Sequence, residues 1–138
     1  MKPEYADLAA YRLGKARATF SDARRFFENA TTSSVVNRLY YALFYAVNAL
    51  LITDGRSSAK HSGVRSLFNR EYVKTGIARK EHGKLYSVLY DARQEGDYGD
   101  FIEFDRKEVR AWLEMAELFI DSIGELVEDR VAENKRAE

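Results

Sequence analysis

The 138-residue sequence contains no cysteine, which excludes a disulfide framework and any zinc or iron–sulfur site built on thiolates. A cysteine-free chain fits a reducing compartment, so we expect a cytoplasmic protein. Long hydrophobic runs are also lacking, because no stretch has the roughly 18 uninterrupted apolar residues that a membrane helix needs. The segment from Met1 to Tyr5 is no apolar signal region. We therefore expect no membrane association.

Proline is rare as well, with Pro3 as its one example, and the sequence has no glycine- or serine-rich run and no internal repeat. Nothing in this pattern resembles a linker, and the length suits one hydrophobic core rather than two. We predict a single domain over residues 1–138, with residues 1–4 and 133–138 frayed.

An excess of charge of either sign is missing, because 22 Lys and Arg balance 22 Asp and Glu. This balance argues against a protein that mainly coats DNA, since such proteins carry a large basic excess. Residues 55–93 nevertheless contain nine basic and three acidic side chains, whereas residues 94–138 contain six and fourteen. Either helical faces or subunits attract each other, or the middle of the chain offers a basic surface to phosphate groups.

Hydrophobic residues recur at alternating steps of three and four along most of the chain, and this period predicts amphipathic helices. No run of period two is bounded by turn signals, so a β-sheet is not expected. The predicted helices cover about residues 5–28, 34–53, 60–74, 79–95 and 105–132. Short connections favour antiparallel neighbours, and we predict an all-α, up-down antiparallel bundle of four main helices plus one short helix.

Capping residues place several helix ends. Gly55, Gly76 and Gly96 follow hydrophobic patterns, at positions where a left-handed glycine often ends a helix. Asp105 and Glu108 have the spacing of a capping box and predict the start of the last helix. Residues 96–104 are predicted to form a loop.

Common enzyme motifs are missing. The sequence has no glycine-rich phosphate loop, no His-Glu-x-x-His, no Gly-x-Ser-x-Gly and no nucleotidyltransferase signature. A metal site would have to combine carboxylates with His61 and His82, the two histidines of the chain. We expect neither a metal ion nor another cofactor.

One group of polar and aromatic residues lies on the second predicted helix. Arg38, Tyr41 and Tyr45 are spaced i, i+3 and i+7 and share one helical face. A guanidinium beside phenols can bind phosphate and stack a base. Alternatively, the arginine is buried against a carboxylate and the tyrosines pack against other helices.

Two further groups lie at predicted helix ends. Lys60 and His61 begin the third helix, where free backbone N–H groups favour anions; a plain cap with a packed histidine is the alternative. Arg93 lies in the last turn of the fourth helix, ahead of Asp97 and Tyr98. This group either binds a ligand or pins the following loop through an Arg–Asp pair.

These groups, in this order, resemble the small prokaryotic HEPN proteins over about residues 5–130. The likeness rests on four runs of sequence: Arg38-Leu39-Tyr40-Tyr41-Ala42-Leu43-Phe44, Lys60-His61-Ser62-Gly63-Val64, Tyr72-Val73-Lys74-Thr75-Gly76, and Arg93 through Asp97-Tyr98. The resemblance implies a bundle of four principal helices with a shorter extra one, commonly in a symmetric dimer. It also implies a nucleotidyltransferase as partner protein, in a toxin–antitoxin pair. Some members are metal-independent ribonucleases, and others bind nucleotides.

The ribonuclease members carry an arginine, four to six intervening residues and then a histidine. Arg93 matches the arginine, but after four residues this sequence has Tyr98 and no nearby histidine. A phenol with a pKa of about 10 is a poor general base at neutral pH. His61 would have to supply the proton transfer from another helix.

We therefore expect a HEPN-like module that binds a nucleotide or RNA, acts as a homodimer and pairs with a nucleotidyltransferase. The first alternative is an active metal-independent ribonuclease toxin that uses Arg93, His61 and Tyr98 in catalysis. The second is a structural dimerisation or adaptor bundle. The predicted ligand-binding residues are Arg38, Tyr41, Lys60, His61, Arg93, Asp97 and Tyr98.

Overall fold

The computed structural model describes residues 1–98 and 103–137, with the side chains of residues 96–98 outside the description. It consists of α1 (Pro3–Asn29), α2 (Thr32–Thr53), α3 (His61–Phe68), the π-helix η1 (Asn69–Val73), α4 (Lys80–Tyr98) and α5 (Arg106–Ala137). These described residues include no β-strand. The predicted all-α class is confirmed.

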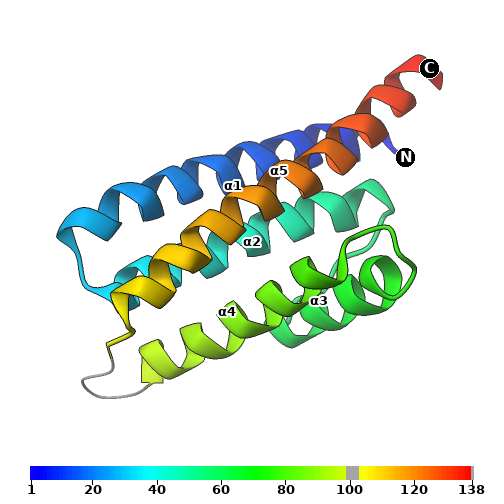
Figure 1. Cartoon of the computed structure of the whole chain (residues 1–138). Coiled ribbons are helices and arrows are strands. Elements are labelled where there is room, and N and C mark those ends of the chain that lie inside the picture. Colours follow the sequence, from blue (N-terminus) through cyan, green and yellow to red (C-terminus); the bar gives the residue numbers. More distant parts are fainter. Residues whose placement is uncertain (99–102, 138) are drawn as a thin grey trace.

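The four long helices alternate in direction along the chain (Figure 1). α2 lies in the middle of the bundle and packs against α1, α3, α4 and α5. α3 and η1 lie beside α4, on the side of α2 away from α1 (Figure 1). This arrangement confirms the predicted up-down bundle with one short extra element.

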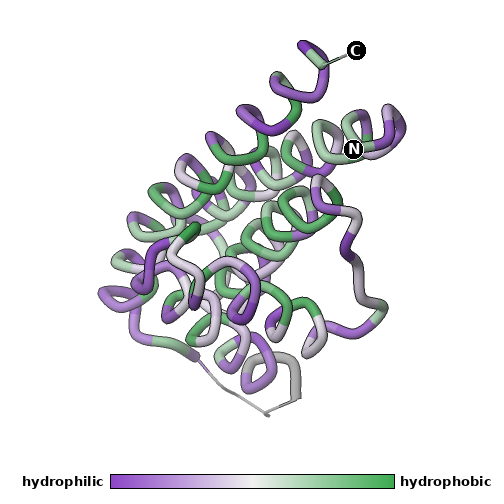
Figure 2. The backbone as a smooth tube through the Cα atoms, turned by 90° about the vertical axis from the view of Figure 1, so that its right-hand side faces the viewer, coloured by the Kyte–Doolittle hydropathy of each residue, from purple (hydrophilic) through white to green (hydrophobic). Residues whose placement is uncertain are grey.

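The core is built around α2, since most of its side chains are buried. α2 is long and apolar enough to cross a membrane, but 67% of its most apolar window is buried inside the bundle. Burial of that kind is typical of the central helix of a bundle. Figure 2 shows hydrophobic and hydrophilic residues alternating along α1 and α5, in agreement with the period that predicted them.

Capping side chains and left-handed glycines lie at the ends of several helices, and Gly55, Gly76 and Asp105 are among the predicted ones. Thr31 precedes α2 and its side chain accepts a hydrogen bond from the Ser34 backbone N–H. Gly55 and Gly76 have φ values of 70° and 82°, the left-handed conformation that glycine adopts without strain. Asp105 caps α5 by accepting a hydrogen bond from the Lys107 backbone N–H at 3.1 Å.

The predicted end of the fourth helix at Gly96 is wrong. α4 continues through this residue to Tyr98, so the segment from 96 to 98 is not part of a loop. A glycine inside a helix costs only about 1 kcal/mol relative to alanine, and neighbouring helical residues can outweigh that cost. α4 tolerates another internal glycine at Gly83. α5 likewise continues past the predicted end at Ala132, to Ala137.

The third predicted helix, residues 60–74, is divided in the structure. Lys60 is the N-cap, α3 follows, and the chain then widens into the π-helix η1. A π-helix has no distinct period in so short a stretch, so the sequence pattern did not reveal it. π-Helical turns occur frequently at functional sites.

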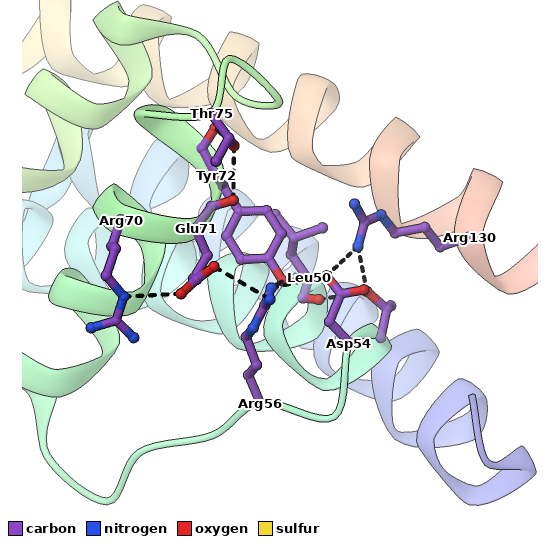
Figure 3. A network of polar contacts seen from close by, with 9 residues as sticks. Leu50, Asp54, Arg56, Arg70, Glu71, Tyr72, Thr75 and Arg130 are labelled. Atoms are coloured by element: carbon purple, nitrogen blue, oxygen red, sulfur yellow. Dashed lines mark hydrogen bonds and ion pairs between the residues drawn. The ribbon is translucent and has the colours of Figure 1, made fainter.

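A polar network fixes η1 against the end of α2 and against α5 (Figure 3). The Tyr72 hydroxyl donates a hydrogen bond to Asp54 at 2.5 Å, and Arg130 of α5 donates to the same carboxylate. Arg56 donates to the Tyr72 hydroxyl at 3.1 Å and lies 3.3 Å from a Glu71 carboxylate oxygen. The network therefore holds η1 against α5 and against the residues that follow α2.

Candidate functional site

Arg93 lies on the face of α4 that packs against α2. The residue is only 9% exposed. Its guanidinium lies 4.8 Å from the centre of the Tyr40 ring and 5.8 Å from that of Tyr41. A guanidinium over aromatic rings keeps its positive charge and its planar orientation. The arginine is thus held in a fixed place at the α2–α4 contact.

His61, the first residue of α3, reaches the same aromatic residues from another direction. Its Nδ1 lies 2.7 Å from the Tyr40 hydroxyl. Its ring stacks on Phe44 at 4.5 Å and meets Tyr41 edge-on at 5.8 Å. The structure therefore brings His61 and Arg93, which are far apart in the sequence, around one tyrosine.

Burial first, and the positive charge of Arg93 second, lower the pKa of His61 below its ordinary value. The imidazole is therefore neutral at physiological pH. Burial also raises the pKa of Tyr40 to about 12, so this phenol remains protonated. A protonated phenol can donate to Nδ1, and the neutral imidazole then carries its own proton on Nε2.

Tyr40 is the site residue that sequence reasoning missed. Its spacing from Val36, Leu43 and Val47 is that of the buried stripe of α2, which indicates a core residue, and Tyr40 is indeed fully buried. The centre of its ring lies 5.9 Å from that of Tyr86 and 6.0 Å from that of Tyr90. The signal that could have revealed it is the hydroxyl, because a buried tyrosine usually needs a hydrogen-bond partner.

The predicted face of Arg38, Tyr41 and Tyr45 is present. The Arg38 guanidinium lies 5.5 Å from the centre of the Tyr41 ring, and the Tyr41 and Tyr45 ring centres are 6.0 Å apart. Arg38 also donates two hydrogen bonds to the Asn37 side chain, at 2.9 and 3.2 Å. All three residues are partly exposed, so this face extends from the buried Arg93 to the surface.

Lys60 precedes His61 in the chain, but among the residues that the structure describes its side chain forms no hydrogen bond or ring contact with Tyr40, Tyr41 or Arg93. The residue is exposed and its backbone N–H donates to the Ser58 side chain at 3.2 Å. Within residues 1–98 and 103–137, no ion pair is formed by its ammonium group. The predicted ligand contacts of Asp97 and Tyr98 concern side chains outside the described residues, and they stay predictions.

Arg65 of α3 contacts two residues of α4 and so joins the helices that carry His61 and Arg93. The Arg65 guanidinium lies 4.1 Å from the centre of the Tyr90 ring and 3.8 Å from an Asp91 carboxylate oxygen. Sequence reasoning did not single out this pair, because its members become neighbours only when α3 packs beside α4. We refer to Tyr40, Tyr41, His61 and Arg93 below as the Tyr40 cluster.

The Tyr40 cluster combines a fixed cation, a neutral imidazole and two phenols. A guanidinium can hold a phosphate through paired hydrogen bonds, and aromatic rings can stack against a base. A neutral imidazole can also take or give a proton near pH 7. The arrangement suits a phosphate ester that carries an aromatic base.

Comparison with known proteins places the chain in a family. Residues 9–126 match the HEPN domain. A UPF0332 protein of Thermotoga maritima is 46% identical over 126 residues, which are 91% of this chain and 96% of that protein. Two Methanocaldococcus jannaschii proteins that carry the word toxin in their names are 31% and 32% identical, each over 78% of this chain and over 73% and 80% of their own lengths. The chain therefore belongs to the HEPN domain family, as the order of its sequence motifs suggested.

Proposed function

We propose that this protein is a HEPN module whose Tyr40 cluster binds the phosphate and base of a nucleotide or of RNA. The observation that carries the proposal is the convergence of Arg93 from α4 and His61 from α3 on the Tyr40 ring. Buried cations are costly, so a buried guanidinium beside a histidine favours a functional role over a structural one.

In this proposal Arg93 binds the phosphate and Tyr41, which is partly exposed, stacks against the base. Arg38 and Lys60 add positive charge at the edge of the site. Asp97 orients Arg93 and Tyr98 contacts the ligand. The proposal places the protein in the cytoplasm, where an RNA ligand would be met.

A binding assay with substituted protein tests this function. We expect Arg93→Ala to weaken binding of a fluorescently labelled RNA dinucleotide about 10- to 100-fold, since a charged hydrogen bond is worth roughly 1.5–3 kcal/mol. Arg79→Ala is the matched control, because this arginine is exposed and lies just before α4. Equal affinities of the two variants, both folded by circular dichroism, would remove the basis of the proposal.

A metal-independent ribonuclease is the second candidate function. The observation that favours it is the neutral His61 close to Arg93, because this imidazole can replace the motif histidine whose position Tyr98 occupies. In that mechanism the Nδ1–H of His61 donates to the Tyr40 hydroxyl, so that Nε2 is free to take the proton of the ribose 2′-hydroxyl. The 2′-oxygen then bonds to the phosphorus, the bond to the 5′-oxygen of the next nucleotide breaks, and this oxygen takes a proton from water. Arg93 stabilises the charge on the phosphate. Cleavage of labelled RNA in EDTA that disappears in both His61→Ala and Arg93→Ala supports an enzyme. Intact RNA with the wild-type protein supports binding alone.

The proposal also includes two protein partners. Relatives that carry the word toxin in their names support a toxin–antitoxin setting, and we propose a nucleotidyltransferase as the partner protein and a homodimer as the working form. Light scattering after gel filtration measures the oligomeric state. Growth arrest on expression that a co-expressed nucleotidyltransferase relieves would support the pairing, and harmless expression of the protein alone would argue against a toxin.

A further inference from the structure

We propose that Lys15 and Tyr45 form a second, base-stacking subsite next to the Tyr40 cluster, so that the ligand is a strand of several nucleotides rather than a single one. This inference rests on the proposed function. It concerns a surface along the α1–α2 seam that the Tyr40 cluster itself does not use.

The first observation is a continuous series of partly exposed rings. His61 meets Tyr41 at 5.8 Å, and Tyr41 meets Tyr45 at 6.0 Å. The Phe44 ring lies 4.5 Å from the His61 ring and 5.9 Å from the Tyr45 ring, so it contacts both ends of this series. All four side chains are partly exposed. Rings in such a series can each contact a base of a single strand, because every base has a face that stacks.

The second observation is the position of Lys15. Its ammonium lies 4.5 Å from the centre of the Tyr45 ring, although the residue belongs to the neighbouring helix α1. Within the described part of the chain, Lys15 forms no ion pair with a carboxylate. By contrast, Arg17, two residues later, pairs with Glu128 of α5 at 2.5 Å. Lys15 is therefore a cation held beside an aromatic ring and available to a phosphate.

The third observation is the sign of the charge around these residues. Residues 8–21 of α1, the whole of α2 and the whole of α3 contain no aspartate or glutamate. Arg12, which donates a hydrogen bond to the Asn48 carbonyl at 3.3 Å, adds a second cation to the same seam. These three stretches contribute cations and rings to the surface, a combination that suits a polyanion carrying aromatic bases. An acidic protein surface is a poorer match, because it would pair with cations but has no bases to stack on the aromatic rings.

Oligonucleotides of increasing length test the subsite. We would measure fluorescence anisotropy with labelled 2′-O-methyl oligouridylates of two, four and eight nucleotides, which a ribonuclease using the 2′-hydroxyl cannot cleave. Wild-type protein is expected to bind the octamer more tightly than the dimer. Tyr45→Leu is expected to weaken octamer binding at least about fivefold and dimer binding less than about twofold.

Lys15→Gln provides a second variant that does not depend on core packing, since Lys15 is exposed. It is expected to reduce the slope of log affinity against log salt by roughly 0.7 for the octamer, the share of one phosphate contact on a single strand. Phe26→Leu and Lys74→Gln are matched controls, because Phe26 is 40% exposed in the last turn of α1 and Lys74 follows η1. Neither control is expected to change the dependence of affinity on length.

The outcomes separate the subsite from the proposed function. Binding that requires Arg93 but is equally tight for all lengths, and unchanged in both subsite variants, overturns the subsite alone. Variants that change the oligomeric state but not the dependence on length would instead make this face an interface between copies of the chain, which also overturns it. No binding at any length removes the proposed function and the subsite with it.

Discussion

At the level of single residues, Tyr40 contacts both His61 and Arg93. The Arg93 guanidinium lies over its ring, and its hydroxyl forms a hydrogen bond with His61. Since its phenol stays protonated, it can hold the imidazole in the neutral form. Through this buried phenol, α2 contacts one side chain of α3 and one of α4.

The substitution Tyr40→Phe tests this role of the hydroxyl. We expect the pKa of His61 to rise, because a hydrogen bond that favours the neutral imidazole is lost, and the free energy of unfolding to fall by about 1 kcal/mol. Histidine NMR during a pH titration measures the first effect and urea unfolding the second. An unchanged titration of His61 in a folded variant would show that the hydroxyl does not control this imidazole.

His82, unlike His61, is buried, and its titration predicts how stability depends on pH. It is 6% exposed, and within the described residues its Nδ1 has no hydrogen-bond partner. Burial lowers its pKa; Glu81 opposes this effect and Arg79 adds to it. The unfolded chain therefore binds this proton more tightly than the folded protein, so the stabilisation is present above pH about 6.5 and is lost as the pH falls.

We expect urea unfolding to show lower stability at pH 5.5 than at pH 7.5, by up to about 1 kcal/mol from His82. His61 contributes in the same direction, because its pKa is lowered too. In His82→Gln the difference between the two pH values should be smaller than in the wild type. A variant with the full difference would assign the pH dependence to other groups.

At the level of elements, the network in Figure 3 joins η1 to the residues that follow α2 and to α5. Asp54 is shared by Tyr72 and Arg130, and it is two-thirds buried. Burial of Tyr72, together with its hydrogen bond to this carboxylate, raises the pKa of the phenol to about 12. Loss of the carboxylate would leave two arginines and a buried hydroxyl without their common partner.

We expect Asp54→Ala to lower the free energy of unfolding by about 1–3 kcal/mol, since it removes charged hydrogen bonds from a partly buried position. Asp22→Ala is the control, because its pair with Arg25 is on the surface and should be worth no more than about 1 kcal/mol. Urea unfolding of both variants measures the difference. Equal effects would mean that the network contributes no more than a surface pair.

The helices themselves could largely be predicted from the sequence, because period and caps are local properties. Gly55 and Gly76 end their segments in the left-handed conformation, as expected. Gly96 does not end α4, since glycine can also remain inside a helix and only neighbouring structure decides between the two. The π-helix η1 could not be predicted either, because so short a π-helix has no distinct sequence period.

On the scale of the whole molecule, the site depends on how helices pack, and here the sequence was less informative. The i, i+3, i+7 spacing predicted that Arg38, Tyr41 and Tyr45 share a face, and contacts confirm it. The approach of His61 to Arg93 could not be predicted, because it requires α3 and α4 to meet the same turn of α2. Part of the uneven charge has a structural use, since the acidic helix α5 pairs with α1 through Arg17–Glu128 and Arg24–Glu117.

The most direct test of the central claim is histidine NMR during titration with an RNA dinucleotide. The chain has two histidines, so His61 reports on the proposed site and His82 on the core. We predict that the ligand shifts the His61 signals and raises the pKa of His61, because a bound phosphate favours the charged imidazole, while His82 is unaffected. In Arg93→Ala the same response should need about 10- to 100-fold more dinucleotide. His61 signals that stay unchanged in wild-type protein at saturating dinucleotide would contradict a nucleotide- or RNA-binding site at the Tyr40 cluster.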